Sequence, residues 1–405
     1  MKIGAFLRQN GRWLGAGALL TFLSSFGQTY FISIFADEIR GAYGLSHGAW
    51  GGIYTLGTSV SAAVMIWAGG LTDRFRVRVL GAVVLIGLIG ACLMMASVRA
   101  LWLLPVTIFA LRFLGQGMCS HIAVVAMSRW FVATRGRALS VAGLGFAAGE
   151  AVLPILFVSL LLVIDWHLLW IAAAVVAGLS IPLLLWLLQT ERTPQSVAET
   201  DQFAGMNNIH WTRNAAFRHW LFWFMVPALL GPSAFNTAFF FQQVHYAEVK
   251  GWAHIELVAL FPLYTGFGIC AMLLAGWLLD RFSAARLIVF YQLPLIVAFL
   301  IFAGAVSAWG ALAGLLFLGM SQGANAVWPN GFWAEFYGTR HLGSIKAMAT
   351  AVMVFGSAIG PGLTGFLIDA GVGIETQYNL VAGYFAIASV IMFIGVRRAR
   401  VLLAR

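Results

Sequence analysis

Charged residues are scarce in this chain, and cysteine is almost absent. Asp, Glu, Lys and Arg make up 9% of the 405 residues, whereas 61% are hydrophobic; an average soluble domain has about 25% charged residues. The three cysteines lie in apolar segments without the spacing of metal ligands, so neither a disulfide framework nor a zinc site is indicated. No Gly-x-x-x-x-Gly-Lys-Ser/Thr segment occurs, so ATP-driven transport is not predicted. These scarcities exclude a soluble enzyme and point to a lipid bilayer as the solvent.

Apolar stretches of membrane-spanning length are abundant. A hydrocarbon core about 30 Å thick is crossed by about 20 helical residues. Such stretches lie at 13–36, 49–71, 79–98, 101–128, 138–164, 168–188, 220–244, 253–279, 287–306, 308–332, 345–368 and 378–396. We therefore expect an all-α membrane protein with twelve transmembrane helices.

The basic residues predict the orientation of these helices. The formal net charge is +10, and with the N-terminus inside only Arg40, Arg99 and Lys250 of the 24 Lys and Arg residues fall on the outer side, while Arg112 lies inside a helix. Lys and Arg concentrate in short cytoplasmic loops. Both termini are therefore predicted to be cytoplasmic, in a bacterial-type inner membrane. The basicity is interpreted as orientation and not as a nucleic-acid-binding patch.

An internal repeat divides the chain. Residues 69–75 read GGLTDRF and residues 276–282 read GWLLDRF, and the same offset of 207 positions carries Gly149 onto Gly356 and Pro154 onto Pro361. Repeats of this kind are common in secondary transporters. They predict a six-helix bundle at 1–188, a cytoplasmic linker at 189–217 and a second six-helix bundle at 218–405.

The doubled motif resembles that of the major facilitator superfamily, which carries a Gly-x-Leu-x-Asp-Arg-x-Gly-Arg pattern after the second helix. Gly69, Leu71, Asp73, Arg74 and Arg78 match this pattern, with Arg76 in place of its second Gly. The segment from Arg129 to Gly145, followed by Gly149, also resembles the monocarboxylate and oxalate/formate-type transporters. The resemblance implies the major facilitator fold and movement of a solute by alternating access.

Polar residues at the ends of the motif helices are candidates for gating. Asp73 could contact basic residues such as Arg137 and so hold one side of the protein closed. The alternative is a solvated turn that carries orientation charges. The gating candidates are Asp73, Arg74, Arg137, Asp280 and Arg281.

Two charged residues are predicted to lie near the membrane midplane. Arg112 in the fourth helix and Glu150 in the fifth both fall roughly 16 to 20 Å from the helix ends. Because a charge costs about 2.5–3.5 kcal/mol at this depth, each needs a partner or water. Mutual pairing is the simplest arrangement. The functional hypothesis assigns Arg112 to an anionic substrate group and to proton coupling, and Glu150 to a coupling proton; the alternative is a permanent structural ion pair.

Neutral polar residues complete the candidate substrate site. An interhelical hydrogen bond is as good an interpretation as a substrate contact for each of them. They are Gln28, Tyr30, Tyr54, Gln116, Asn236, Tyr264, Gln322, Asn325 and Trp328. His121 is interpreted as an interior histidine.

These observations predict a proton-coupled secondary transporter for a small anionic, monocarboxylate-like solute. No enzymatic activity, metal or cofactor is expected, and the partners are the solute, protons and the bilayer, with a monomer as the functional unit. The alternatives are an exporter of amphipathic organic compounds and a non-transporting membrane sensor.

Overall fold

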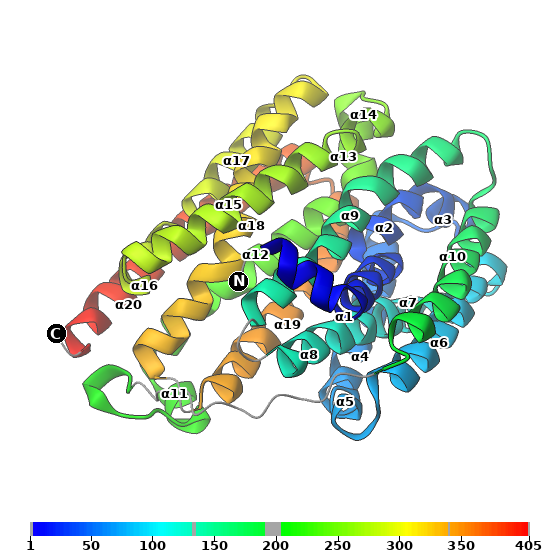
Figure 1. The fold of residues 1–405 in the computed structure, drawn as a ribbon. Coiled ribbons are helices and arrows are strands. Elements are labelled where there is room, and N and C mark those ends of the chain that lie inside the picture. Colours follow the sequence, from blue (N-terminus) through cyan, green and yellow to red (C-terminus); the bar gives the residue numbers. More distant parts are fainter. Residues whose placement is uncertain (1–2, 132–134, 191–203, 339–340, 404–405) are drawn as a thin grey trace. The chain divides into compact units, whose positions relative to one another are not determined.

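The computed structural model describes residues 3–131, 135–190, 204–338 and 341–403, and these form helices and turns without a β-strand. The chain separates into two compact units, Met1–Glu199 and Thr200–Arg405 (Figure 1). The predicted all-α architecture is confirmed.

The described residues of the first unit form ten α-helices. They are α1 (Ile3–Leu23), α2 (Thr29–Ile32), α3 (Ala36–Tyr43), α4 (His47–Ala68), α5 (Leu71–Arg74), α6 (Val77–Ser97), α7 (Leu104–Leu111), α8 (Ser120–Trp130), α9 (Arg135–Leu161) and α10 (Trp166–Leu187). A π-helical segment, Arg112–Cys119, joins α7 to α8.

Ten more α-helices lie in the part of the second unit that the structure describes. They are α11 (Arg213–Arg218), α12 (Trp220–Phe241), α13 (Gln243–Lys250), α14 (His254–Val258), α15 (Phe261–Arg281), α16 (Ala284–Leu287), α17 (Leu293–Gly304), α18 (Ala308–Tyr337), α19 (Leu342–Asp369) and α20 (Ile374–Ala399). Serine side chains cap two of the long helices: the Ser46 hydroxyl accepts from the N–H of Ala49 before α4, and Ser307 accepts from Gly310 before α18.

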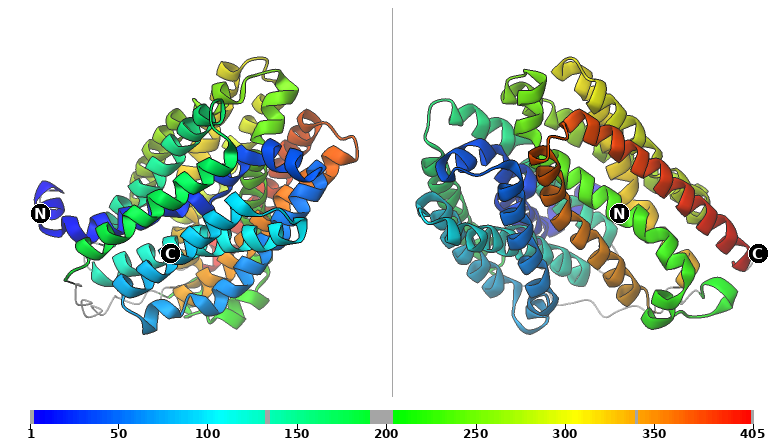
Figure 2. Two further views of the ribbon diagram at one scale, coloured as in Figure 1. Left: turned by 90° about the vertical axis from the view of Figure 1, so that its right-hand side faces the viewer. Right: turned by 180° about the vertical axis from the view of Figure 1, so that it is seen from behind.

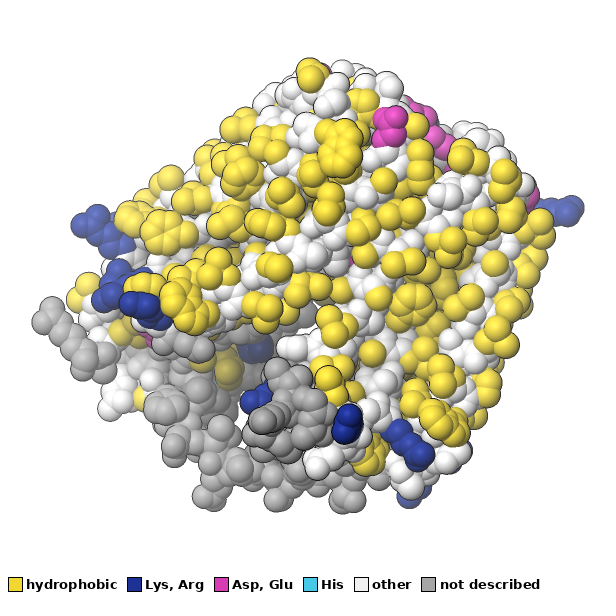
Figure 3. Space-filling view, turned by 45° about the horizontal axis from the view of Figure 1, so that its top comes forward, with side chains coloured by type: hydrophobic (Ala, Val, Ile, Leu, Met, Phe, Trp, Pro, Cys, Tyr) yellow, Lys and Arg dark blue, Asp and Glu magenta, His cyan; other side chains and the backbone are white. Residues whose placement is uncertain are grey.

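Most of the long helices can cross a membrane. Among the described residues, ten helical spans are long and apolar enough, and the bent pair Phe6–Gly27 and Thr29–Tyr43 forms an eleventh. α4 occupies the place of the second predicted helix and has 22 residues, enough to span the hydrocarbon core. Hydrophobic side chains dominate the upper part of the face in Figure 3, whereas Lys and Arg gather mainly along its lower part and edges.

Each unit repeats the same helix pairings. In the first unit α1 packs on α9, α4 on α7, and α6 on α10; in the second, α12 packs on α19, α15 on α18, and α17 on α20 (Figures 1 and 2). Gly149 of α9 faces Ser25, and Gly356 of α19 faces the backbone of Leu230 and Ala234. A glycine permits this close approach of two helices. The repeat seen in the sequence therefore corresponds to repeated packing in space.

Pro232 interrupts the hydrogen bonding of α12. Proline has no N–H for the carbonyl four residues earlier, which belongs to Ala228. Gln292 donates its amide to this carbonyl at 2.7 Å, and the hydroxyl of Tyr291 donates to it as well. Inside a membrane a freed backbone carbonyl needs a protein donor. The two side chains supply it from the turn before α17.

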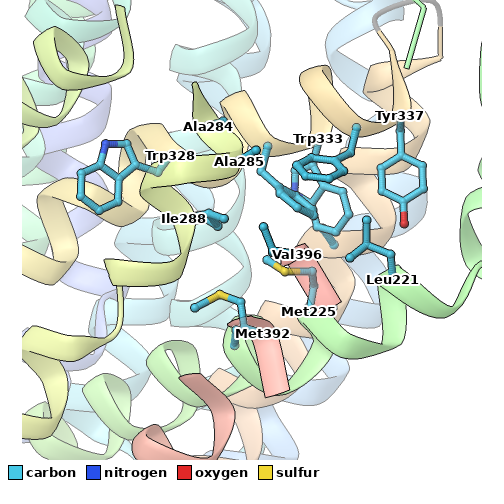
Figure 4. Close-up of a cluster of buried hydrophobic side chains, with 14 of the residues drawn as sticks. Leu221, Met225, Ala284, Ala285, Ile288, Trp328, Trp333, Tyr337, Met392 and Val396 are labelled. Carbon is cyan, nitrogen blue, oxygen red and sulfur yellow. The ribbon is translucent and has the colours of Figure 1, made fainter. Parts of the chain in front are cut away.

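The core of the second unit continues into part of the predicted linker. Buried side chains of α12, α16, α18 and α20 pack together, including Met225, Ala285, Trp333 and Met392 (Figure 4). Residues 204–218 fold onto the end of α18, where the N–H of Trp211 donates to the carbonyl of Tyr337 at 3.3 Å. This part of the predicted linker is therefore attached to the second unit.

Candidate functional site

Arg112 is the most deeply buried charged side chain of the candidate site. Its exposed fraction is 1%. Its Nη1 donates to the carbonyl of Gly27 at 3.1 Å and to the hydroxyl of Thr29 at 3.2 Å, and its guanidinium carbon lies 5.3 Å from the ring centre of Tyr54. Its Nε has no hydrogen-bond partner among the described residues. Every one of these contacts is with a neutral group.

A break in the first long helix makes the Gly27 carbonyl available. The backbone tightens into a 3₁₀ turn over Ser24–Gly27, and Gln28 is extended at φ −83° and ψ 152°. The flanking helical segments meet at 48°. Such a break leaves backbone groups without helical partners. Arg112 donates a hydrogen bond to one of these groups, the carbonyl of Gly27.

The fourth helix is modified where it meets the break. The π-helical segment begins at Arg112. A Cβ on Gly115 would lie 2.7 Å from the Cα of Gly27, so only glycine at both positions allows the two backbones to touch. π-Helical turns are frequent at functional sites because they place side chains that a regular helix could not.

Glu150 reaches the same broken segment from a different helix. It lies in α9 with an exposed fraction of 8%. Its charge acts on Tyr30, whose hydroxyl donates to the Ser25 hydroxyl at 2.8 Å. The expected direct pair with Arg112 is not formed in this structure. The reason is geometric: the break in the first helix supplies neutral acceptors to Arg112.

Thr29 joins two of the predicted site residues and is absent from the sequence-based set. Its hydroxyl is 2.6 Å from that of Tyr54 and also accepts from Arg112. Gln28, between the two residues that bind Arg112, is 9% exposed, and Gln116 is partly buried in the π-helical segment. The polar run Ser24, Ser25, Gly27, Gln28 and Thr29 in an otherwise apolar helix was the signal for this segment.

The predicted site residues of the second unit have mixed environments. Asn236 has a buried Oδ1 without a hydrogen-bond partner among the described residues. Tyr264 is buried, whereas Gln322 is exposed and Asn325 partly exposed. The indole N–H of Trp328 donates to the carbonyl of Ala275 at 3.0 Å. Trp328 thus uses its polar group to hold α18 against α15.

The predicted gating residues are only partly described. Arg74 and Arg137 are exposed, and Arg281 lies over the ring of Trp277 at 5.6 Å. The side chains of Asp73 and Asp280 fall outside the described part of the structure. The turn that begins the first motif is held by Gly69, whose carbonyl accepts from the hydroxyl of Thr72 at 2.8 Å and lies 3.1 Å from Nε2 of His121.

Comparison with known families decides the classification. Residues 17–361 match the family described as Major Facilitator Superfamily. The chain belongs to the major facilitator superfamily. It is therefore a multi-pass membrane protein of a transporter family. A search of curated proteins finds no match.

Solved structures of this superfamily share the fold. A bacterial homologue of the human lysosomal transporter Spinster, in an inward-facing and unoccupied conformation, is 15% identical with a TM-score of 0.72, and the match covers 98% of each chain. The nucleoside transporter NupG is 14% identical with a TM-score of 0.71, over 95% of this chain and 98% of that one. At these identities the likeness establishes the fold alone. The resemblance to monocarboxylate and oxalate/formate-type transporters receives no support from these matches.

Proposed function

We propose that this major facilitator protein is a proton-coupled carrier of small anionic organic solutes, with Arg112 as the anion-binding residue. The observation that carries the proposal is the burial of Arg112 against neutral partners only. Its place is proposed to be the inner membrane, with both termini in the cytoplasm and one chain as the transporting unit.

The energetic argument concerns an uncompensated cation. Carbonyl, hydroxyl and aromatic groups reduce the cost of burying a guanidinium, but they do not neutralise its charge. A carboxylate or phosphate neutralises it and can accept from two N–H groups at once. The unpartnered Nε of Arg112 is a donor that such a ligand would use. Ligand binding would thus supply the counter-charge that the described protein groups do not.

The neighbouring amides support an organic solute instead of a bare inorganic anion. Gln28 and Gln116 flank the contact between Gly27 and Gly115, where Arg112 begins the π-helical segment. Amide side chains can donate to and accept from hydroxyl or carbonyl groups of a ligand. A small carboxylate with a second polar group, of the monocarboxylate-like class, fits this set.

Proton coupling is assigned to Glu150. A buried carboxylate is stabilised in its protonated form by desolvation, so its charge can be exchanged during a transport cycle. Since Arg112 and Glu150 both meet residues 24–30, coupling would pass through the broken helix and not through a direct ion pair. Protonation of Glu150 would change the field on Tyr30 and its bond to Ser25.

A ligand screen on purified protein tests the anion site. We expect small carboxylates to raise the unfolding temperature of the intact protein, and neutral nucleosides and hydrophobic cations to have no comparable effect. Arg112→Ala should weaken carboxylate binding by about 2–5 kcal/mol, or roughly 30- to 5,000-fold in affinity.

The matched control is Arg99→Ala, which removes an exposed arginine outside the site. It should bind carboxylates as the parent protein does. Stabilisation by a carboxylate that survives Arg112→Ala would contradict the proposed anchor. Stabilisation by hydrophobic cations alone would favour the exporter of amphipathic compounds.

A further inference from the structure

The π-helical segment Arg112–Cys119 lies between two hydrogen-bonding residues in the middle of the fourth helix. At its first residue, Arg112 holds the broken first helix through Gly27 and Thr29. Two residues after its end, His121 lies 3.1 Å from the carbonyl of Gly69. α7 and α8 continue regularly on either side. The irregular segment is therefore the only non-α part of the described helix between these two anchors.

A π-helical segment differs from an α-helix by register. Its i→i+5 hydrogen bonds enclose one residue more per turn than the bonds of an α-helix, so a π-helical segment holds an extra residue in the same length of helix. If one such residue is absorbed into regular α-helix, the part beyond it rotates by about 100° and moves by about 1.5 Å. A rotation of that size at α8 would carry His121 away from Gly69. The two anchors therefore cannot both persist when the segment changes its bonding.

The local sequence weakens the preference for a regular α-helical register. Gly115 and Gly117 weaken the preference for a regular helix by about 1 kcal/mol each. A Cβ on Gly117 would meet the flexible sulfur of Met65 at 2.9 Å, whereas one on Gly115 would meet the backbone of Gly27. The contact between Gly115 and Gly27 thus stabilises the π-helical form of the segment. This contact depends on the position of Arg112.

We propose that His121 is a positioning residue of the transport cycle, through which the π-helical segment transmits the state of Arg112 to the turn at Gly69. In the present arrangement Arg112 holds the break and His121 holds the turn. When an anion draws Arg112 from Gly27 and Thr29, the segment changes register and His121 releases the Gly69 carbonyl. The identity of the anion rests on the proposed function above; the connection between the two anchors does not.

The readout is the reactivity of a cysteine at the turn. Phe75, six residues after Gly69, is exposed, so Phe75→Cys should react with a maleimide. Cys270 is exposed and is replaced by Ser, while Cys92 and Cys119 are buried and stay. Labelling rates are measured on the full chain in detergent or liposomes, without any added substrate.

The test is a double-mutant cycle between Arg112→Gln and His121→Phe. We expect Arg112→Gln to change the labelling rate and His121→Phe to abolish that effect, which gives a coupling of at least about threefold. Thr29→Val, which removes one acceptor of Arg112 and leaves the guanidinium, provides a second cycle if Arg112→Gln does not fold. His121→Gln, which restores an N–H donor for the Gly69 carbonyl, should recover the response.

His167→Phe is the matched control, since His167 is a partly exposed histidine that contacts Asp165 at the start of α10. Its cycle with Arg112→Gln should be additive. Additive rates in both His121 cycles would overturn the proposal, as would a response that survives His121→Phe. Because no substrate is present, this result stands whether or not carboxylates bind, so a failure of the anion site is recognised separately.

Discussion

Arg112 and Gly27 are separated by 85 residues and are joined by a hydrogen bond of 3.1 Å from the guanidinium to a backbone carbonyl. The bond exists because the first helix breaks at Gly27 and leaves that carbonyl without a helical donor. A charged side chain therefore serves the backbone of a neighbouring helix. Removal of the guanidinium should affect both the fold and the proposed ligand site.

Thr29→Val tests the contribution of the shared hydroxyl. The substitution keeps the shape of the side chain but removes the acceptor for Arg112 and the partner of Tyr54. We expect a loss of about 1.5–3 kcal/mol in the free energy of unfolding, as for hydrogen bonds to charged groups. Chemical denaturation in a mild detergent measures it. Thr107→Val, whose hydroxyl bonds only within its own helix turn, should have a smaller effect.

Glu150→Gln tests proton coupling. The amide keeps the size of the side chain but cannot exchange a proton, so uptake driven by a pH gradient should fall to background in proteoliposomes. Exchange of internal for external solute at equal pH should persist, because it needs no net proton movement. Glu256→Gln on α14 is the matched control. Undiminished pH-driven uptake in Glu150→Gln would exclude the proton role.

Gly149→Ala and Gly360→Ala test close helix contacts in the first and the second unit. A Cβ would lie 2.0 Å from Oγ of Ser25 in the first case and 2.1 Å from the carbonyl of Ala234 in the second. Overpacking of this kind costs about 1–3 kcal/mol. Thermal unfolding should show the loss for both variants. Gly143→Ala, with open space at its Cβ, should leave stability unchanged or raise it.

Tyr291→Phe and Gln292→Leu test the support of the Pro232 interruption. Each variant leaves one donor on the Ala228 carbonyl, so single substitutions should be mild. The double variant leaves the carbonyl unsatisfied and should lose about 1–3 kcal/mol more than the sum of the two single losses. If the loss of unfolding free energy in the double variant equals the sum of the two single losses, the two donors act independently of this carbonyl.

His219 predicts a pH effect at the start of α12. Burial lowers the pKa of its imidazole below the usual 6.5, with Tyr337 3.5 Å and the Trp211 ring 4.7 Å away. Since the unfolded chain binds the proton more readily, stability should fall as the pH drops below about 6.5 and should be independent of this histidine at higher pH. His219→Gln should flatten this slope. An unchanged slope in that variant would assign the effect to other groups.

The sequence identified the chemistry of the first unit better than its geometry. A charge in an apolar helix is visible as a residue type, so Arg112 and Glu150 could be recognised as buried and functional candidates. Their partners could not, because the acceptor for Arg112 is a backbone carbonyl that becomes free only when the helix breaks. The hydropathy of residues 13–36 averages over Gln28 and predicts one continuous helix, whereas the structure has a 48° bend there.

The same limit applies to the second unit. Trp328 has the residue type of a ligand contact, yet its indole N–H is used between α15 and α18.

The π-helical segment of the first unit could not be predicted either. Eight residues are too few to show a periodicity of their own, and only Gly115 and Gly117 indicate an irregular helix there. Residue type therefore predicts which side chains lie inside the bundle, and three-dimensional packing decides which of them remain available to contact a ligand.

The interrupted first helix of each unit bears on the internal repeat of the chain. Ser25 in the broken turn and Pro232 in α12 are 207 positions apart, the offset of the loop motif itself. One interruption is served by an arginine of the fourth helix and the other by a tyrosine and a glutamine before α17. The two halves thus share an irregularity at the same position of the first helix and differ in the side chains that satisfy the freed carbonyl. The repeat extends to the interruption of the backbone but not to the groups that compensate it.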